Sequence, residues 1–234
     1  MPIVSFVTPK GGAGKTTATV VLACELAERG MQVAILDFDR NQPINAWASK
    51  PIGPPKGITV YPNVNKTNIY DKRDEAEMND WVFIDGEGSG SEEASYAICA
   101  SKFVIIPLQK TQLDAMQASK AIKVIRQEER RIKAEIPFRL LFGRTQSWVM
   151  AGVQRDIEAA FAASPSDASQ TGVQALPVEL SERSAFQAIF AYGGSLSTLP
   201  AKGTGNLATA RKNAAALADA FLAFDQSIKT EEAA

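Results

Sequence analysis

The chain has 234 residues, with 25 basic and 26 acidic side chains, a net charge of −1 and no histidine. The missing histidine excludes Ser-His and Cys-His nucleophilic chemistry, together with the commonest zinc ligand. Because bulk charge is close to zero, any affinity for nucleic acid must come from a local basic patch.

The two cysteines, Cys24 and Cys99, are far apart and lie among apolar residues. We expect two buried free thiols, with a disulfide as the alternative, and free thiols suit a reducing cytoplasm. The first six residues show neither a basic leader nor a long apolar stretch, so we expect no signal peptide and no membrane span there.

Short apolar runs alternate along the chain with longer segments of helical periodicity. Continuous apolar runs, unlike alternating ones, indicate a parallel sheet that is covered on both faces. The sequence therefore predicts an α/β fold, a doubly wound and mostly parallel sheet with helices on both faces. Strands are expected at 3–8, 32–37, 58–61, 81–85, 103–107 and 138–142, and long helices at 15–29 and about 206–224.

Two polar stretches, 52–65 and 162–172, read as surface loops and are too short to be convincing domain linkers. We therefore predict a single domain over 1–226. The last residues, 227–234, are predicted to form a frayed tail.

A glycine-rich turn follows the first strand and opens directly into a helix. Its backbone N–H groups and the positive end of the new helix suit a bound phosphate. Lys15 is expected to reach the β- and γ-phosphates of ATP, and the Thr16 hydroxyl to ligate Mg²⁺. The alternative is a glycine-rich turn without a ligand. The predicted nucleotide-binding residues are Lys10, Gly11, Gly12, Ala13, Gly14, Lys15, Thr16 and Thr17.

Three aspartates stand at the carboxyl ends of predicted strands, where doubly wound sheets bind ligands. Asp37 and Asp39 end the second long strand, and the period of two places both carboxylates on one face. Asp85 closes the run WVFID, a Walker B pattern that would hold a water on Mg²⁺. The predicted metal site is Thr16, Asp37 and Asp85. The alternatives are a helix N-cap for Asp39 and a turn aspartate for Asp85.

A second lysine at the start of the loop, with proline at position 9 in place of the expected glycine, resembles the deviant Walker A loop of the ParA/MinD family. The resemblance implies that ATP is sandwiched between two protomers and that Lys10 reaches the partner's phosphates. It also implies that Asp39 positions the attacking water, so Lys10, Lys15 and Asp39 are the predicted catalytic residues for slow, Mg-dependent ATP hydrolysis. A solvated lysine is the alternative for Lys10.

Other segments of the chain also resemble short ParA-type partition ATPases. The chain is similar to VirC1 in its length and in its phosphate loop. These segments are Trp47, Ile106 to Leu108 with Asp114, and 176–196. After Asp85 the chain departs from the family pattern: the glycine-rich stretch 86–90 is predicted to order on ATP binding and to loosen after hydrolysis.

In this family, basic residues near the dimer edge bind DNA without sequence preference. The candidates here are Arg183, Lys202, Arg211 and Lys212, although glycine and threonine follow Lys202 where the family usually has another basic residue. A second basic cluster lies at 120–133. Acidic residues interleave it, so we interpret it as a solvated helix face.

The resemblance thus implies a dimerising ATPase, cytoplasmic and nucleoid-associated in the ATP state, that partitions plasmid or chromosomal DNA or positions another cargo. A ParB-like or cargo-adaptor protein would stimulate hydrolysis. One alternative is a membrane-cycling MinD-like ATPase, which the acidic C-terminal residues disfavour. The others are an iron–sulfur-bridged relative, for which the cysteines are badly placed, and an ATP-dependent ligase, which gives no reason for Lys10.

Overall fold

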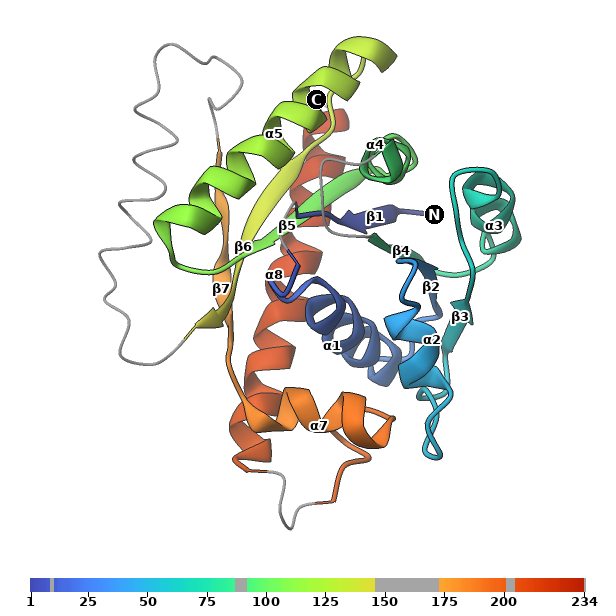
Figure 1. The fold of residues 1–234 in the computed structure, drawn as a ribbon, viewed down its shortest axis with the longest axis vertical. Helices are drawn as coiled ribbons and strands as arrows, with labels where there is room; N and C mark the ends of the chain where they lie inside the picture. Colours follow the sequence, from blue (N-terminus) through green and yellow to red (C-terminus); the bar gives the residue numbers. More distant parts are fainter. Residues whose placement is uncertain (9–10, 87–91, 146–172, 201–204, 234) are drawn as a thin grey trace.

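A computed structural model describes residues 1–8, 11–86, 92–145, 173–200 and 205–233 (Figure 1). Within these residues, seven strands form one sheet in which all neighbours are parallel, in the order β3-β2-β4-β1-β5-β6-β7. The fold class predicted from the apolar runs is confirmed. The strands are β1 (Ile3–Phe6), β2 (Val33–Phe38), β3 (Ile58–Tyr61), β4 (Trp81–Gly86), β5 (Phe103–Leu108), β6 (Phe138–Thr145) and β7 (Ala175–Ser181).

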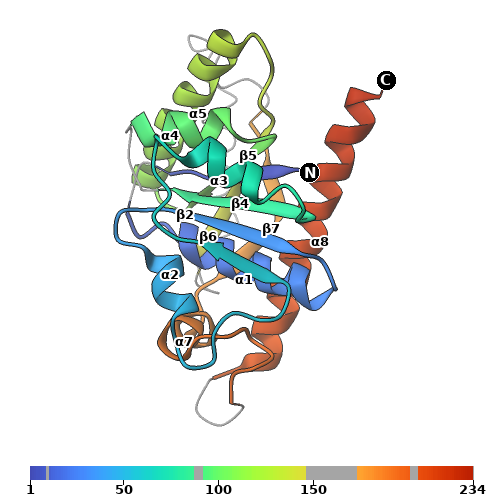
Figure 2. The same ribbon diagram turned by 90° about the vertical axis from the view of Figure 1, so that its right-hand side faces the viewer.

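Helices cover both faces of the sheet (Figures 1 and 2). One face carries α1 (Lys15–Glu28), α2 (Pro43–Ala48), α7 (Ser184–Tyr192) and α8 (Leu207–Glu232), whose buried side chains share one core cluster. The other face carries α3 (Ile69–Glu75), α4 (Glu92–Cys99) and α5 (Gln112–Ile132).

Successive residues of β2 illustrate why the strands are apolar throughout. Val33 and Ile35 belong to the core beneath α1, whereas Ala34 and Leu36 belong to the core beneath α3. Because successive side chains point to opposite faces, a strand covered on both faces needs apolar residues at every position.

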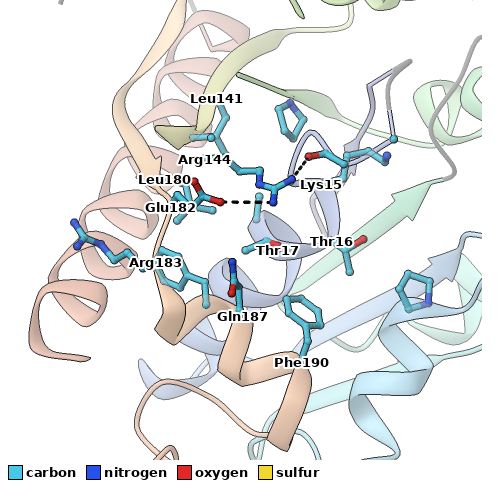
Figure 3. Close-up of a pocket in the computed structure, with 18 of the residues that line it drawn as sticks. Lys15, Thr16, Thr17, Leu141, Arg144, Leu180, Glu182, Arg183, Gln187 and Phe190 are labelled. Atoms are coloured by element: carbon cyan, nitrogen blue, oxygen red, sulfur yellow. Dashed lines mark hydrogen bonds and ion pairs between the residues drawn. The ribbon is translucent and has the colours of Figure 1, made fainter. Parts of the chain in front are cut away.

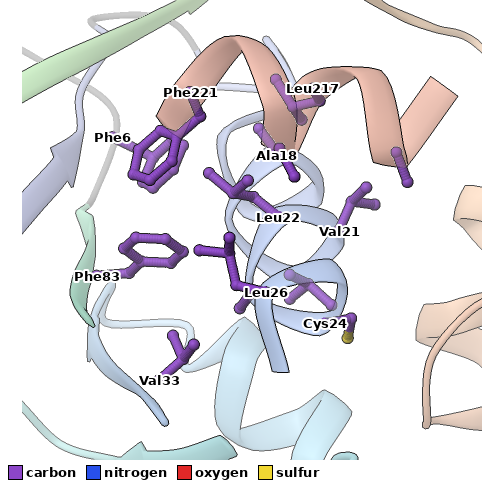
Figure 4. Close-up of a cluster of buried hydrophobic side chains, with 14 of the residues drawn as sticks. Phe6, Ala18, Val21, Leu22, Cys24, Leu26, Val33, Phe83, Leu217 and Phe221 are labelled. Carbon is purple, nitrogen blue, oxygen red and sulfur yellow. The ribbon is translucent and has the colours of Figure 1, made fainter. Parts of the chain in front are cut away.

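The core between the sheet and α8 is rich in aromatic rings (Figure 4). Phe221 of α8 packs on Trp81 and Phe83 of β4, with ring centroids 4.7 and 5.7 Å away. It also packs on Phe103 of β5 at 5.4 Å. These contacts fix the C-terminal helix across the strands β4 and β5, on either side of the strand that leads to the phosphate loop.

The chain end differs from the predicted frayed tail. Helix α8 continues to Glu232, and Ile228 is buried in the core. Lys229 pairs with Asp225 one turn earlier, and Lys102 pairs with Glu232 at 3.3 Å. The prediction missed that Ile228 continues the apolar face of Phe221 and Phe224.

Candidate functional site

The phosphate loop joins β1 to α1 at the carboxyl edge of the sheet. Gly12 and Gly14 have φ angles of 79° and 96°, in the left-handed region that glycine adopts without strain. Gly14 is the N-cap of α1, so the first free N–H groups of the helix lie at the loop. Lys15 is buried although it carries a charge, and it opens the helix beside the cavity described below.

Asp85 is fully buried and connects the loop to β4. Its Oδ2 accepts a hydrogen bond from Thr16 Oγ1 at 2.7 Å, and its Oδ1 accepts one from Thr19 Oγ1 at 3.1 Å. Burial raises the pKa of Asp85 to about 7, although the two threonines and the charge of Lys15 act to lower it. Thr16 and Asp85, two of the three residues of the predicted metal site, are therefore in direct contact.

Asp37 lies beside Asp85 in the sheet and is also fully buried. Its Oδ2 accepts the backbone N–H of Asn45 in α2 at 2.8 Å, while its Oδ1 has no hydrogen-bond partner among the described residues. Burial raises the pKa of Asp37 to about 6, and the nearby charge of Asp39 adds to the effect. Buried polar atoms are usually hydrogen-bonded, so this oxygen is open to a water or an ion.

The donor set of this corner suits a divalent cation. One hydroxyl, from Thr16, and two buried carboxylates, from Asp37 and Asp85, are the hard oxygen ligands that Mg²⁺ takes, and Mg²⁺ usually keeps several waters and phosphate oxygens as well. Within the described part of the chain, the unpartnered Oδ1 of Asp37 leaves one oxygen available for such a cation or for a water on it.

Asp39 follows β2 and is half-buried at the wall of the cavity. Its Oδ1 accepts the backbone N–H of Asn41 at 2.8 Å, which closes a short turn. The N-cap of α2 is Gln42, so Asp39 is not the helix cap that we considered as its alternative role. Asp37, not Asp39, accepts an N–H group of that helix.

A cavity of about 550 Å³ opens over the phosphate loop (Figure 3). Its polar part is lined by loop residues from Gly11 to Thr17 together with Asp39, and its apolar part by side chains from the ends of β6 and β7 and from α7. The apolar lining is Leu141, Leu180, Phe186 and Phe190. The cavity therefore offers both a phosphate-binding end and an apolar end.

Arg144 is a cavity residue that the sequence analysis missed. Its Nη1 donates to the carbonyl oxygen of Gly12 at 2.9 Å, and its Nη2 lies 3.6 Å from Glu182 Oε1 (Figure 3). Its φ angle of 52° costs about 1 kcal/mol for a residue with a side chain. An arginine at the end of an apolar run was the only available signal, and it does not reveal where the guanidinium points.

Comparison with known proteins agrees with this geometry. The VirC1 protein family model matches residues 1–226. Protein ParA of Rhizobium radiobacter is 33% identical over 222 residues, which are 94% of this chain and 96% of that protein. The chain belongs to the VirC1 family.

Two solved structures place this VirC1-family chain in the ParA/MinD fold. The cell division ATPase MinD of Pyrococcus furiosus superposes with a TM-score of 0.67 at 16% identity, covering 95% of this chain and 99% of MinD. The ParA of pNOB8 bound to nonspecific DNA superposes with a TM-score of 0.54 at 17% identity, covering 70% of this chain and 76% of that ParA. The resemblance to ParA/MinD P-loop ATPases is therefore confirmed.

Several predicted residues of the VirC1-family chain lie outside the described residues. These are Lys10, Lys202 and residues 87–90 of the glycine-rich stretch 86–90. Among the described DNA candidates, Arg183 stands at the wall of the cavity, with its guanidinium directed away from Gln187 and Phe190 (Figure 3). Lys212 is exposed at the start of α8.

Arg211 contacts the protein itself. Its guanidinium donates to the carbonyl oxygen of Leu196 at 2.9 and 3.1 Å and to that of Ser197 at 3.4 Å. It thereby braces the 195–199 segment against α8. This structural role was not visible in the sequence, because the segment it holds is distant along the chain.

Two further expectations about the VirC1-family chain can be compared with the structure. On α5, Arg126 pairs with Glu129 and Arg131 with Glu128, but Glu128 is buried, so this part of the cluster differs from the solvated face that we expected. Both cysteines are free thiols; Cys24 is buried as predicted, but Cys99 is only half-buried.

No helix in the described part of the chain is long and apolar enough to span a membrane.

Proposed function

We propose that the chain is a ParA-type ATPase that dimerises around ATP, binds DNA without sequence preference in the ATP state, and so partitions plasmid or chromosomal DNA or positions another cargo. The hydrogen bond from Thr16 to Asp85, at the edge of a cavity of about 550 Å³, carries this proposal. It joins the phosphate loop to a buried strand-end carboxylate, which is the arrangement a P-loop NTPase needs for Mg²⁺ and phosphate.

Nucleotide binding follows from the two ends of the cavity. The N–H groups of the loop and the Lys15 ammonium would hold the β- and γ-phosphates. The apolar end beside Leu180 and Phe186 would take the base. Thr17 lines the same cavity.

Hydrolysis would use Mg²⁺ held by Thr16, Asp37 and Asp85. Bound there, the cation would neutralise charge that develops on the transferred phosphoryl group. Asp39, half-buried and facing the cavity, would orient the attacking water. No other protein base is required for slow transfer of phosphate to water.

A sandwich dimer would bring Lys10 of each protomer to the nucleotide of the other. Leu113 and Met116 support an interface of this kind, because these apolar side chains are 55% and 60% exposed at the start of α5. Gln109, three residues before the helix, donates to the carbonyl oxygen of Gly12, so this exposed stretch adjoins the phosphate loop. A second copy of the chain would cover it.

DNA binding is proposed on the basis of the relatives and of local charge. Arg183, Lys202 and Lys212 are the candidate phosphate contacts, whereas Arg211 is already engaged by backbone carbonyls. Contacts of this type weaken as salt increases. A ParB-like or cargo-adaptor protein would stimulate hydrolysis, and the chain would be cytoplasmic and associated with the nucleoid while ATP is bound.

Fluorescence anisotropy of a random-sequence DNA duplex, titrated with protein, tests the proposal. We expect binding in ATP-Mg that is weakened by salt, and little binding in ADP-Mg. Lys212→Ala should weaken it, whereas Lys120→Ala, an exposed lysine on α5, is the matched control. Equal binding in both nucleotide states, or none in either, would contradict the DNA switch. Light scattering with ATP should separately give a dimer for the wild type and a monomer for Lys10→Ala.

A further inference from the structure

The end of β6 contains one residue more than its neighbour β7. Gly143 is paired with Leu180 and Thr145 with Ser181, so Arg144 has no counterpart on β7. It also adopts a φ angle of 52°. A bulge of this kind redirects a side chain, and it often lies next to a binding site.

The bulge lies directly against the phosphate loop. A Cβ atom on Gly143 would stand 3.4 Å from the carbonyl oxygen of Ala13, so the residue before Arg144 lies within van der Waals distance of the loop backbone. Arg144 Nη1 donates to the Gly12 carbonyl oxygen at 2.9 Å, and Gln109 Nε2 lies 3.4 Å from the same oxygen. The loop is thus held from two neighbouring strand ends, β5 and β6.

Arg144 is placed between the two ends of the cavity. Figure 3 shows its guanidinium between Lys15 and Glu182, and Glu182 Oε1 lies 3.6 Å from Nη2. The side chain of Arg144 remains 47% exposed, so the ion pair leaves donors available. Arg144 therefore lines the same cavity as the phosphate loop and Leu180, within reach of a molecule that occupies both.

We propose that Arg144 is a nucleotide-binding residue supplied by the same protomer, contacting ATP or ADP where the phosphate chain meets the nucleoside. Glu182 and the Gly12 carbonyl orient its guanidinium, whose planar fork suits phosphate oxygens. The inference rests on the proposed nucleotide binding. Because the contact lies on the part of the molecule that ATP and ADP share, it differs from the γ-phosphate contact expected of Lys10.

Binding of fluorescent ATP and ADP analogues to the full-length protein tests the assignment. Arg144→Ala should weaken both nucleotides about tenfold, the ordinary effect of losing one charge-assisted hydrogen bond. Arg144→Lys keeps the charge but lacks the planar fork. Its affinity for each nucleotide should lie between those of the wild type and Arg144→Ala. Arg130→Ala, which removes an exposed arginine far along α5, should bind as the wild type does.

The outcomes separate this inference from the function on which it rests. A wild type that binds neither nucleotide would overturn both. A wild type that binds, with unchanged affinities in Arg144→Ala, would overturn the inference alone, as would a loss confined to ATP. Thermal denaturation distinguishes binding from folding: the nucleotide-induced rise in Tm should shrink in Arg144→Lys even if Arg144→Ala proves too unstable to measure.

Discussion

Asp37 and Asp85 are register partners on the neighbouring parallel strands β2 and β4, and both are fully buried. Burial raises the pKa of Asp37 to about 6 and that of Asp85 to about 7. At neutral pH, burial and mutual repulsion both disfavour the ionised forms of these two adjacent carboxylates. A bound cation would offset this electrostatic cost.

This relationship predicts how stability changes with pH when no nucleotide or cation is bound. Between about pH 4 and pH 7 the folded chain keeps the proton of Asp85 that the unfolded chain has lost. The free energy of unfolding contributed by this group therefore falls as pH rises through that window. Asp85→Asn removes the charge, so its Tm should exceed that of the wild type at pH 8 and approach it near pH 4.

Thermal denaturation followed by circular dichroism at both pH values, with chelator present, measures the difference. Asp71→Asn, which alters an exposed aspartate on α3, controls for net charge. A Tm of Asp85→Asn below that of the wild type at pH 8 would contradict the prediction.

Asp39→Ala should separate ATP binding from hydrolysis. The Asp39 carboxylate faces the cavity. Among the described residues, its side chain makes no hydrogen bond to the phosphate loop or to Asp37 and Asp85. Binding of ATP should therefore persist, while turnover should fall about 100-fold if the carboxylate orients the attacking water. Phosphate release and a fluorescent ATP titration measure the two effects, with Asp71→Ala as the control. Turnover at the wild-type rate would refute the role.

Lys15→Ala should instead abolish nucleotide binding. Lys15 is the buried cation of the loop, and the phosphates lose both charge and a donor when it is removed. The same fluorescent ATP titration measures this loss of binding. Binding that survives in Lys15→Ala would mean that the phosphates lie elsewhere in the cavity.

The sequence predicted the sheet, and the positions of Asp37 and Asp85 at its carboxyl edge, because each depends on local patterns. A run such as WVFID is apolar at every position when both faces are covered, and its closing aspartate necessarily stands at the ligand-binding edge. Arg144 depends instead on the register between β6 and β7, which brings a residue without a counterpart on β7 against the loop. Arg211 likewise depends on a segment that returns from α7. Neither arrangement has a signature in the order of residues.

Gly194 is predicted to be intolerant of a side chain. It has a φ angle of 73°, and a Cβ atom there would overlap the Thr198 hydroxyl and stand 2.7 Å from Ile52 Cγ2. Its carbonyl oxygen also accepts the indole N–H of Trp47 at 3.0 Å. Gly194→Ala should lower the free energy of unfolding by about 3 kcal/mol, from strain and overpacking together.

Gly30→Ala is the matched control for the backbone effect. Gly30 has a φ angle of 90°, but no described atom lies within 4 Å of the position that an alanine Cβ would take, so the substitution should cost only about 1 kcal/mol. Urea denaturation of both variants measures the difference. Equal costs would mean that the contacts around Gly194 relax without penalty.

The last turns of α8 should contribute to stability, contrary to a frayed end. Ile228 is 4% exposed and belongs to the core cluster that contains Phe221 and Phe224. Ile228→Ala should cost about 2–4 kcal/mol, because it removes buried carbon atoms and leaves a cavity. Thr230→Ala, an exposed residue on the same turn, should change the free energy of unfolding by less than about 0.5 kcal/mol. Urea denaturation compares the two, and a cost for Ile228→Ala no larger than that for Thr230→Ala would mean that the helix end is open in solution.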